Sequence, residues 1–282
     1  MANAIKGIDH CVILVRDLDV AHQKMSALGF TLTPRGVHSA HIGTANHCIM
    51  LRQAYFEVLS VRTPTDYNAS WRAKLTLRQG LDAVPIASDD VEAARAQLMA
   101  RGMALPAVID FSRPVDLPEG TSKAAFRLVM IPEEYTPHIT MFAIQHFTRE
   151  VVRHSSYLDH PNGAVALTEL VVCVEDVNEA ARRYARYFGI PITRNGMGVE
   201  CALQPGKFIL IDHTGLREAY GIDPPALPFA ASFTVAVTDL RETQNLLEKN
   251  RISLTQRQGK LMVAGSDAHG ANVIFEPLSG QA

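Results

Sequence analysis

The chain has 282 residues, with 27 Lys and Arg against 29 Asp and Glu, and hydrophobic residues make up 47% of it. This length suits one large domain or two of ordinary size, and the apolar fraction supplies a full core. The net charge of -2, with acids and bases interspersed, disfavours a nucleic-acid surface, which needs a basic stripe. No apolar run approaches the roughly 20 residues that a membrane-spanning helix requires.

The cysteines and the N-terminus bear on the cellular compartment. Cys11, Cys48, Cys173 and Cys201 form no C-x-x-C pair, and two of them lie within apolar strand patterns. We therefore expect reduced, buried thiols. The first residues, MANAIKGIDH, lack the basic stretch and apolar segment of a secretory signal. Together these features predict a cytoplasmic protein.

The opening segment GIDHCVILVRDLDVAHQKMSALGF, residues 7–30, predicts a strand followed by a helix. Both alternating sets of strand positions are mostly apolar, so we expect the strand to be covered on both faces. Asp17 suits the N-cap of the helix and Gly29 suits its end. Three short strands should follow, in FTLTP, HCIMLR and AYFEVLSV. The predicted order of elements is β-α-β-β-β.

The same order recurs along the chain, and each copy has an acidic helix cap. An internal repeat with constant punctuation indicates that one supersecondary unit is used several times. We expect four such modules, each with its helix packed on the outer face of a curved sheet. The three later strand–helix pairs are 80–102 with Asp90 as cap, 167–189 with Asp176, and 232–250 with Asp239.

A polar, histidine-rich segment at 147–165 separates the second module from the third, and it contains the turn sequence Pro-Asn-Gly. We interpret it as a connector between a first domain at 1–146 and a second at 166–282, each holding two modules. The histidines of this region, His146, His154 and His160, are expected at the surface, because connectors seldom hold side chains rigidly.

Several segments resemble the vicinal oxygen chelate superfamily, which includes glyoxalase I, bleomycin-resistance proteins and extradiol dioxygenases. IDHCVILVRDLD, GFTLTP and AYFEVLSV are similar to its first module, and HIGTANHCIML and HPNGAVALTELVV more narrowly resemble bacterial glyoxalase-like domain proteins. The resemblance covers nearly the whole chain. It implies an α+β fold in which four modules form two glyoxalase-like domains with curved, cup-shaped mixed sheets. It also implies metal ligands on the first and last strands of a module, typically a histidine and a glutamate.

These ligand positions can be carried over by their distance from the helix cap. His10 lies seven residues before Asp17 and takes the first-strand position, and Glu57 is the last-strand acid. Glu169 and Ser232 take the first-strand position in the third and fourth modules, and Glu276 is the last-strand acid of the fourth. A hydrogen-bonded core histidine, and an ion pair of Glu57 with an arginine such as Arg52, are the structural alternatives.

The second module offers no ligand at the matching places, which are Ala83, or Asp82 if the register slips by one, and Ala143. The pairing of modules therefore decides the site. First with fourth would join His10, Glu57 and Glu276 around Mn, Fe(II), Ni or Zn. First with second would leave two ligands facing alanines, and this arrangement is favoured because sequential elements are usually neighbours.

The leading functional hypothesis is a metal-dependent lyase or isomerase that chelates two neighbouring oxygens of a small metabolite, with Glu57 or Glu276 moving a proton. The alternatives are an extradiol-type ring-cleaving dioxygenase, disfavoured because Ser232 replaces its second histidine, and a non-catalytic protein that sequesters a small molecule. No nucleotide cofactor, nucleic acid or membrane partner is expected, and a homodimer is compatible with the sequence. Arg113 and Arg127 could bind a substrate carboxylate. The residues expected to contact substrate are Thr44, Asn46, Tyr55, Glu169 and Ser232.

Overall fold

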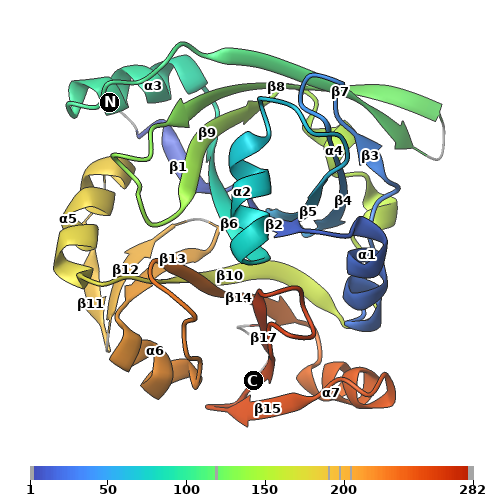
Figure 1. Cartoon of the computed structure of the whole chain (residues 1–282). Coiled ribbons are helices and arrows are strands. Elements are labelled where there is room, and N and C mark those ends of the chain that lie inside the picture. The colour runs from blue at the N-terminus through green and yellow to red at the C-terminus, as the bar shows by residue number, and fades with distance from the viewer. Residues whose placement is uncertain (1–2, 118–119, 190, 197, 204, 279–282) are drawn as a thin grey trace.

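The computed structural model describes residues 3–117, 120–189, 191–196, 198–203 and 205–278 and shows a mixed α+β fold with two curved mixed sheets (Figure 1). The elements of the first half are β1 (Ile5–Ile8), β2 (His10–Val15), α1 (Leu18–Ala27), β3 (Gly36–Val37), β4 (Thr44–Met50), β5 (Tyr55–Val61), α2 (Ala69–Leu77), β6 (Gly80–Ser88), α3 (Val91–Ala100), β7 (Ile109–Leu117), β8 (Gly120–Ile131) and β9 (Thr140–His146).

A short helix, α4 (Arg149–Val152), and a 3-10 turn at Ser155–Tyr157 lead into the second half. The elements of the second half are β10 (Ala164–Cys173), α5 (Val177–Phe188), β11 (Thr193–Asn195), β12 (Gly198–Ala202), β13 (Lys207–Ile211), α6 (His213–Tyr220), β14 (Phe229–Val237), α7 (Leu240–Lys249), β15 (Leu254–Arg257), β16 (Lys260–Val263) and β17 (Asn272–Pro277).

The four predicted helix starts are confirmed. Asp17, Asp90, Asp176 and Asp239 are the N-caps of α1, α3, α5 and α7, and each carboxylate accepts backbone N–H groups of the first turn. Each of these helices is preceded by a strand and followed by three, so all four modules have the predicted order. Helices α2 and α6, which lie between modules, were not expected from the sequence.

The sheet topology shows which modules pair. The first sheet has the order β3-β4-β5-β2-β6-β9-β8-β7, with β1 added beside β6, and the second has the order β11-β12-β13-β10-β14-β17-β16-β15. The first and second modules therefore share one sheet through the antiparallel β2–β6 pair, and the third and fourth share the other through β10–β14. Modules that are consecutive in the chain are therefore neighbours in each sheet, which is the pairing expected from the sequence. The domain limits at 146 and 166 stay a prediction.

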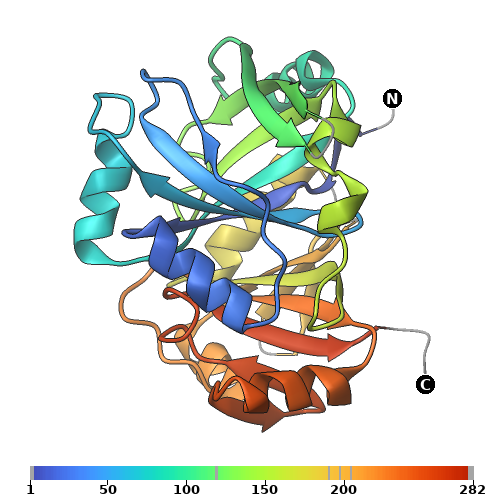
Figure 2. The same ribbon diagram turned by 90° about the vertical axis from the view of Figure 1, so that its right-hand side faces the viewer.

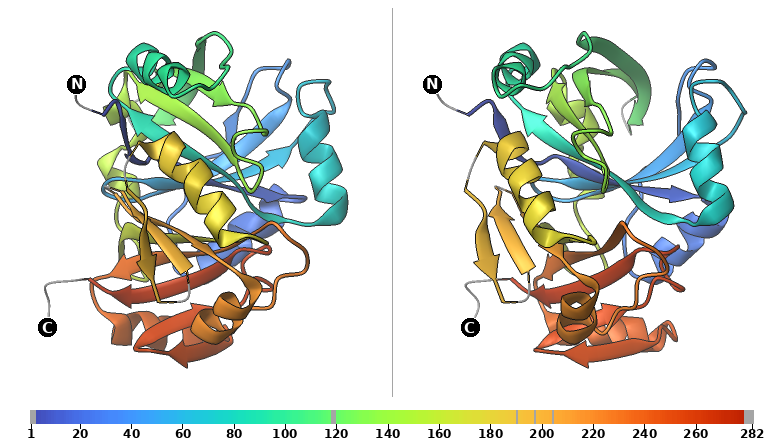
Figure 3. Two further views of the ribbon diagram at one scale, coloured as in Figure 1. Left: turned by 90° about the vertical axis from the view of Figure 1, so that its left-hand side faces the viewer. Right: turned by 60° about the vertical axis from the view of Figure 1, so that its left-hand side comes forward.

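The two sheets stack against each other, with the first half of the chain above the second in Figures 1 and 3. The ring centroids of Phe56 on β5 and Phe233 on β14 are 4.2 Å apart, and those of the stacked Phe30 and Phe275 are 5.9 Å apart. One hydrophobic core joins both sheets with the buried sides of α1, α3, α5 and α7. The other face of each sheet therefore points away from this shared core.

The connector is packed rather than extended. Figure 2 shows it along the same side of the molecule as both termini. His160 is 4% exposed and accepts a hydrogen bond from the backbone N–H of Thr31 at 3.0 Å, while its other ring nitrogen lies 2.7 Å from the Met50 carbonyl oxygen. The expectation that His160 lies at the surface was therefore wrong. No helix in the described part of the chain is long and apolar enough to cross a membrane.

Candidate functional site

A cavity of about 430 Å³ opens on the face of the first sheet that points away from the second sheet. We call it the first cup. Its floor is formed by strands β2, β4, β5, β6, β8 and β9, and α2 contributes a wall that carries Trp71 and Lys74. Most of the lining is apolar or aromatic, which is usual for a small-molecule site. The aromatic side chains are Tyr55, Tyr67, Trp71, Phe111, Phe126 and Phe142.

The alternation of side chains along a strand places the polar residues of this cup. On β5, Phe56 enters the core between the sheets, so Tyr55 and Glu57 face the first cup. On β2, His10 lies beside Tyr55 in the parallel ladder and Val12 lies beside Glu57. His10 and Glu57 are therefore on adjacent strands and line one cavity, as the sequence predicts.

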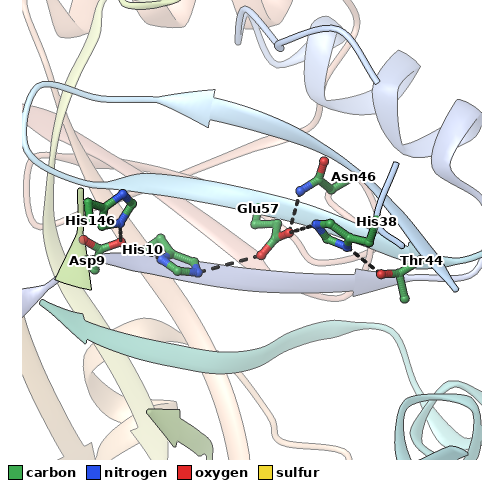
Figure 4. Close-up of polar contacts among 7 residues, drawn as sticks. All are labelled: Asp9, His10, His38, Thr44, Asn46, Glu57 and His146. Carbon is green, nitrogen blue, oxygen red and sulfur yellow. Dashed lines mark hydrogen bonds and ion pairs between the residues drawn. The ribbon is translucent and has the colours of Figure 1, made fainter. Parts of the chain in front are cut away.

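His10 is held from behind by a buried carboxylate. Its Nδ1 lies 2.7 Å from Oδ1 of Asp9, and the same oxygen lies 3.0 Å from Nε2 of His146 on β9 (Figure 4). The Asp9 side chain is fully buried. Burial by itself raises the pKa of Asp9, but the hydrogen bonds and charges of His10 and His146 outweigh it and lower the pKa below its usual range. Asp9 is therefore an anion at neutral pH.

This contact sets the tautomer of His10. An ionised carboxylate can only accept a hydrogen bond, so Nδ1 of His10 carries the proton that it donates to Asp9. In the neutral ring, Nε2 then presents its lone pair toward the cup, where Glu57 Oε2 lies 3.8 Å away. The ring also stacks on Tyr55, with centroids 4.3 Å apart, which restricts its rotation. The arrangement is a histidine base oriented by an acid.

Glu57 lies between two imidazoles. Its Oε1 accepts a hydrogen bond of 2.6 Å from the Asn46 amide and lies 3.8 Å from Nε2 of His38. Burial raises the pKa of Glu57, but His38, His10, Asn46 and Arg113 together lower it below its usual range. Glu57 is thus ionised at neutral pH. No contact with Arg52 is involved.

His38 follows β3 and completes the row of side chains in Figure 4. Its Nδ1 lies 2.6 Å from the Thr44 hydroxyl, and its ring meets Phe111 edge-on. Burial lowers the pKa of His38, partly opposed by Glu57, so its ring is neutral at neutral pH. Thr44 positions His38, and Asn46 and Tyr55 line the cavity. The expected contact of these three residues with substrate stays a prediction.

The two candidate carboxylate-binding arginines have different surroundings. Arg113 of β7 lines the first cup, and it forms no ion pair among the residues that the structure describes. Arg127 instead donates to Asp110 at 2.7 Å, in a surface pair whose side chains are 39% and 77% exposed. Lys74, the other cation of the cup, is paired with Asp82 at 2.7 Å. Arg113 is therefore the cation left to receive an anionic ligand.

Three predicted site residues lie on the second sheet and not in the first cup. Glu276 of β17 pairs with Lys260 at 2.7 Å, and Glu169 of β10 accepts a hydrogen bond of 2.7 Å from the Tyr220 hydroxyl. Ser232 of β14 is fully buried, and its hydroxyl has no hydrogen-bond partner among the described residues. The structure does not bring Glu276, Glu169 or Ser232 beside His10 and Glu57.

Strand register explains why Glu276 does not match Glu57. Glu57 lies opposite Val12, two residues beyond His10 on β2. Glu276 lies opposite Ala236, four residues beyond Ser232 on β14. The place equivalent to Glu57 in the fourth module is occupied by Ile274, opposite Thr234.

The second module shows a shift of one residue from the expected alignment. Ala83 lines the cup at the place that corresponds to His10, as expected. Its ladder partner on β9 is Thr140, so the place corresponding to Glu57 is Phe142, which also lines the cup. Ala143, the residue matched by sequence, is fully buried in the shared core. The second module thus adds an aromatic ring rather than a ligand.

Three contributors to the site were not predicted: Asp9, His38 in its contact with Glu57, and His146. The sequence does contain a signal for Asp9: an acid that directly precedes a buried strand histidine lies close enough to contact that histidine. His146 was expected at the surface, but its side chain is 1% exposed and lies against Asp9. That contact joins residues 137 positions apart, and no local pattern encodes it.

The donor atoms present do not fit a three-ligand metal centre. No group of three His, Cys, Asp or Glu side chains in the described ranges is placed to hold a metal ion. His10 and His38 approach different oxygens of Glu57 from opposite sides, so their Nε2 atoms do not converge on one point (Figure 4). Catalytic metal sites usually have three protein ligands. A dioxygenase triad of two histidines and a carboxylate has its residue types here, but not its geometry.

Comparison with known proteins identifies the family. The family model of the glyoxalase-like domain matches residues 8–188, which include strands β2 to β9 of the first sheet and all the residues that line the first cup. The chain belongs to the glyoxalase-like domain family. Its membership in the vicinal oxygen chelate superfamily, expected from the sequence, agrees with this match. The search of curated proteins found no match.

Solved structures similar to this glyoxalase-like protein show the same fold at low identity. A hypothetical protein from Staphylococcus aureus is 16% identical, with a TM-score of 0.71 over 96% of this chain and 99% of that one. A mutant of 4-hydroxymandelate synthase from Streptomyces coelicolor is 11% identical, with a TM-score of 0.61 over 96% and 92%. A fusion of a xylose isomerase-like TIM barrel with 4-hydroxyphenylpyruvate dioxygenase is 10% identical, with a TM-score of 0.60 over 100% and 51%. These likenesses concern the fold alone.

Proposed function

We propose that this protein is an isomerase or lyase that moves a proton on a small, oxygenated carboxylic acid bound in the first cup. The observation that carries the proposal is the buried Asp9–His10 pair, whose free Nε2 faces the cavity beside Glu57. A core histidine kept only for packing needs neither a dedicated buried carboxylate nor a ring nitrogen facing a cavity of this size.

His10 is the proposed general base. Its Nε2 carries a lone pair toward the cup, whereas Glu57 is an anion of lowered pKa whose Oε1 already accepts a hydrogen bond from Asn46 and is the weaker base. Nε2 would take a proton from a carbon next to a substrate carbonyl, and Asp9 and Glu57 would stabilise the resulting imidazolium. In an isomerase the proton on Nε2, which can exchange with solvent, would pass to the former carbonyl carbon while the proton of the neighbouring hydroxyl moves to the former carbonyl oxygen. In a lyase it would pass to the leaving group as the bond to that group breaks. Glu57 therefore assists the proton transfer rather than starting it.

The rest of the cup would hold the substrate. Arg113 supplies a guanidinium for the carboxylate, and such pairs are often bidentate. The Asn46 amide and the neutral His38 ring border the carbonyl end near Glu57. Cys48 also lines the cavity, but burial raises the pKa of its thiol to about 12, so it is protonated at neutral pH and unsuited to act as a nucleophile.

A direct test follows solvent exchange. Small 2-oxo and 2-hydroxy carboxylic acids are incubated with the protein in D₂O, and loss of the C–H signal beside the carbonyl or hydroxyl is followed by proton NMR. Catalysed exchange with at least one acid supports proton transfer. Tight binding of such acids without any exchange or turnover would favour the alternative, a non-catalytic protein that uses the same cup to sequester a small molecule.

Replacement of Arg113 by Gln is expected to weaken binding of the acid about 10- to 100-fold, because a hydrogen bond to a charged group contributes about 1.5–3 kcal/mol. Isothermal titration calorimetry measures the change. Arg127→Gln removes an arginine that is already paired with Asp110 and should leave the affinity unchanged. Equal losses in both variants would contradict a specific carboxylate site at Arg113.

Metal dependence is tested by melting chelator-treated protein with Mn, Fe(II), Ni or Zn. We expect no rise in melting temperature that depends on His10, because two protein donors make a weak site. A metal bound only to the folded state, at 100-fold excess over its Kd, would add about 2.7 kcal/mol to the free energy of unfolding. A stabilisation of that size that is lost in His10→Ala would support the metal-dependent lyase or isomerase implied by the family resemblance.

A further inference from the structure

A second cavity, of about 520 Å³, lies apart from the first cup and shares none of its lining residues. Its wall combines Lys24 of α1, the 78–79 segment after α2, the 221–229 segment after α6 and the 265–272 loop before β17. Both halves of the chain therefore contribute to it. We call it the interdomain cavity.

Two cations line the interdomain cavity, and neither forms an ion pair among the residues described. The Arg78 guanidinium lies over the Phe229 ring, 5.7 Å from its centroid, and donates one hydrogen bond of 3.1 Å to the Leu81 carbonyl. Burial lowers the pKa of Arg78. Lys24 donates to the Ser266 carbonyl at 2.6 Å. A partly buried cation without an acidic partner is costly, and an anion in the cavity would remove that cost.

His269 supplies a third polar group. Its side chain lines the same cavity, the residue is 6% exposed, and its Nε2 is buried with no hydrogen-bond partner in the described part of the chain. Burial lowers the pKa of His269, opposed by a backbone hydrogen bond with Val20, so the ring is neutral at neutral pH. With one ring nitrogen engaged by that backbone carbonyl, Nε2 is left as a buried acceptor.

The remaining acid of the lining does not neutralise these groups. Asp223 pairs with Arg217 at 2.6 Å and lies 3.5 Å from His213. The loop that carries His269 is fixed close to Arg78, because a Cβ on Gly270 would lie 2.3 Å from the Gln79 carbonyl and φ there is +87°. The backbone thus holds cations from the first half and a buried acceptor from the second half around one space.

We propose that the interdomain cavity binds inorganic phosphate. Arg78 and Lys24 would donate to its anionic oxygens, and a planar guanidinium suits two of them at once. Nε2 of His269 would accept a hydrogen bond from the remaining P–OH. This last contact selects inorganic phosphate over a carboxylate, a sulfate or the dianion of a phosphate monoester, because those anions carry no proton to donate at neutral pH.

The test uses the intact protein with inorganic phosphate. Melting temperature is measured while phosphate replaces chloride at constant ionic strength, with sulfate as a parallel series. Both anions also stabilise proteins by exclusion from their surface, but that effect does not saturate and is common to all variants. We expect a saturable rise with phosphate that is weaker with sulfate. Absence of saturation, or sulfate binding as tightly as phosphate, would overturn the assignment.

Amino-acid replacements show which residues bind the phosphate. Arg78→Gln should weaken the apparent phosphate affinity about tenfold or more, the range for a hydrogen bond to a charged group. Lys24→Gln should weaken it in the same direction, and it keeps the test open if Arg78→Gln fails to fold. Arg113→Gln should have no effect, which separates this site from anion binding in the first cup. An unchanged phosphate affinity in both Arg78→Gln and Lys24→Gln would refute the proposal.

Discussion

His10→Gln is expected to slow substrate proton exchange by about 10²- to 10⁴-fold, the usual contribution of a positioned general base. Gln keeps a polar side chain of similar reach but cannot take a proton. Substrate affinity should change far less, because Arg113 and the aromatic lining remain. The measurement is the exchange rate in D₂O under saturating substrate, with affinity determined separately by calorimetry.

The pH profile distinguishes a base from a merely structural histidine. Wild-type exchange should be slower in acid, because a protonated imidazole cannot take another proton, and the residual rate of His10→Gln should lose that dependence. Glu57→Gln should lower the rate by a smaller factor, because it removes stabilisation of the imidazolium but leaves the base. If Glu57→Gln abolished exchange while His10→Gln did not, the carboxylate would be the base, as the sequence alone suggested.

Glu276→Gln separates the site seen in the structure from the ligand set deduced from the sequence. In the structure Glu276 pairs with Lys260 on the second sheet, so its replacement should leave exchange in the first cup unchanged. A loss comparable to that of His10→Gln would mean that the fourth module takes part in the chemistry after all.

Local signals in the sequence were sufficient to predict the strand–helix pair of each of the four modules. An aspartate cap two or three residues after the end of each first strand fixes where a helix begins, and the cap acts through the backbone of its own first turn. The placement of His10 and Glu57 in one cavity followed from the family resemblance, which implies that the first and last strands of a module carry the site, and the parallel β2–β5 pair agrees with it.

Contacts between distant segments could not be predicted in the same way. Asp9 meets His146 only because β9 pairs with β6, which in turn lies beside β1 and β2. His38 meets Glu57 because the short β3 strand brings it back over β5. Glu276 shows the opposite case: the residue type matched the family pattern, but a register difference of two residues on β17 assigns its place to Ile274.

Asp9→Asn is expected to lower the free energy of unfolding at pH 7 by about 3–5 kcal/mol, the usual cost of removing one partner from a buried ionic contact. One oxygen of Asp9 is shared by His10 and His146, and all three side chains are at most 3% exposed. An amide cannot supply the charge that both rings use. Asp110→Asn is the matched control, because its partner Arg127 is exposed and surface pairs contribute about 0–1 kcal/mol.

The stabilisation that Asp9 provides should depend on pH. Since the pKa of Asp9 is lower in the folded state than its ordinary value of 3.8, the carboxylate stabilises the fold fully at pH values well above 3.8. That stabilisation is lost as the pH falls below this value toward the lower folded-state pKa. Urea unfolding at pH 7 and near pH 3 should therefore show the difference between wild type and Asp9→Asn shrinking on acidification. A difference below about 1 kcal/mol at pH 7, no larger than a surface pair gives, would mean that Asp9 does not hold the two histidines as a buried ion.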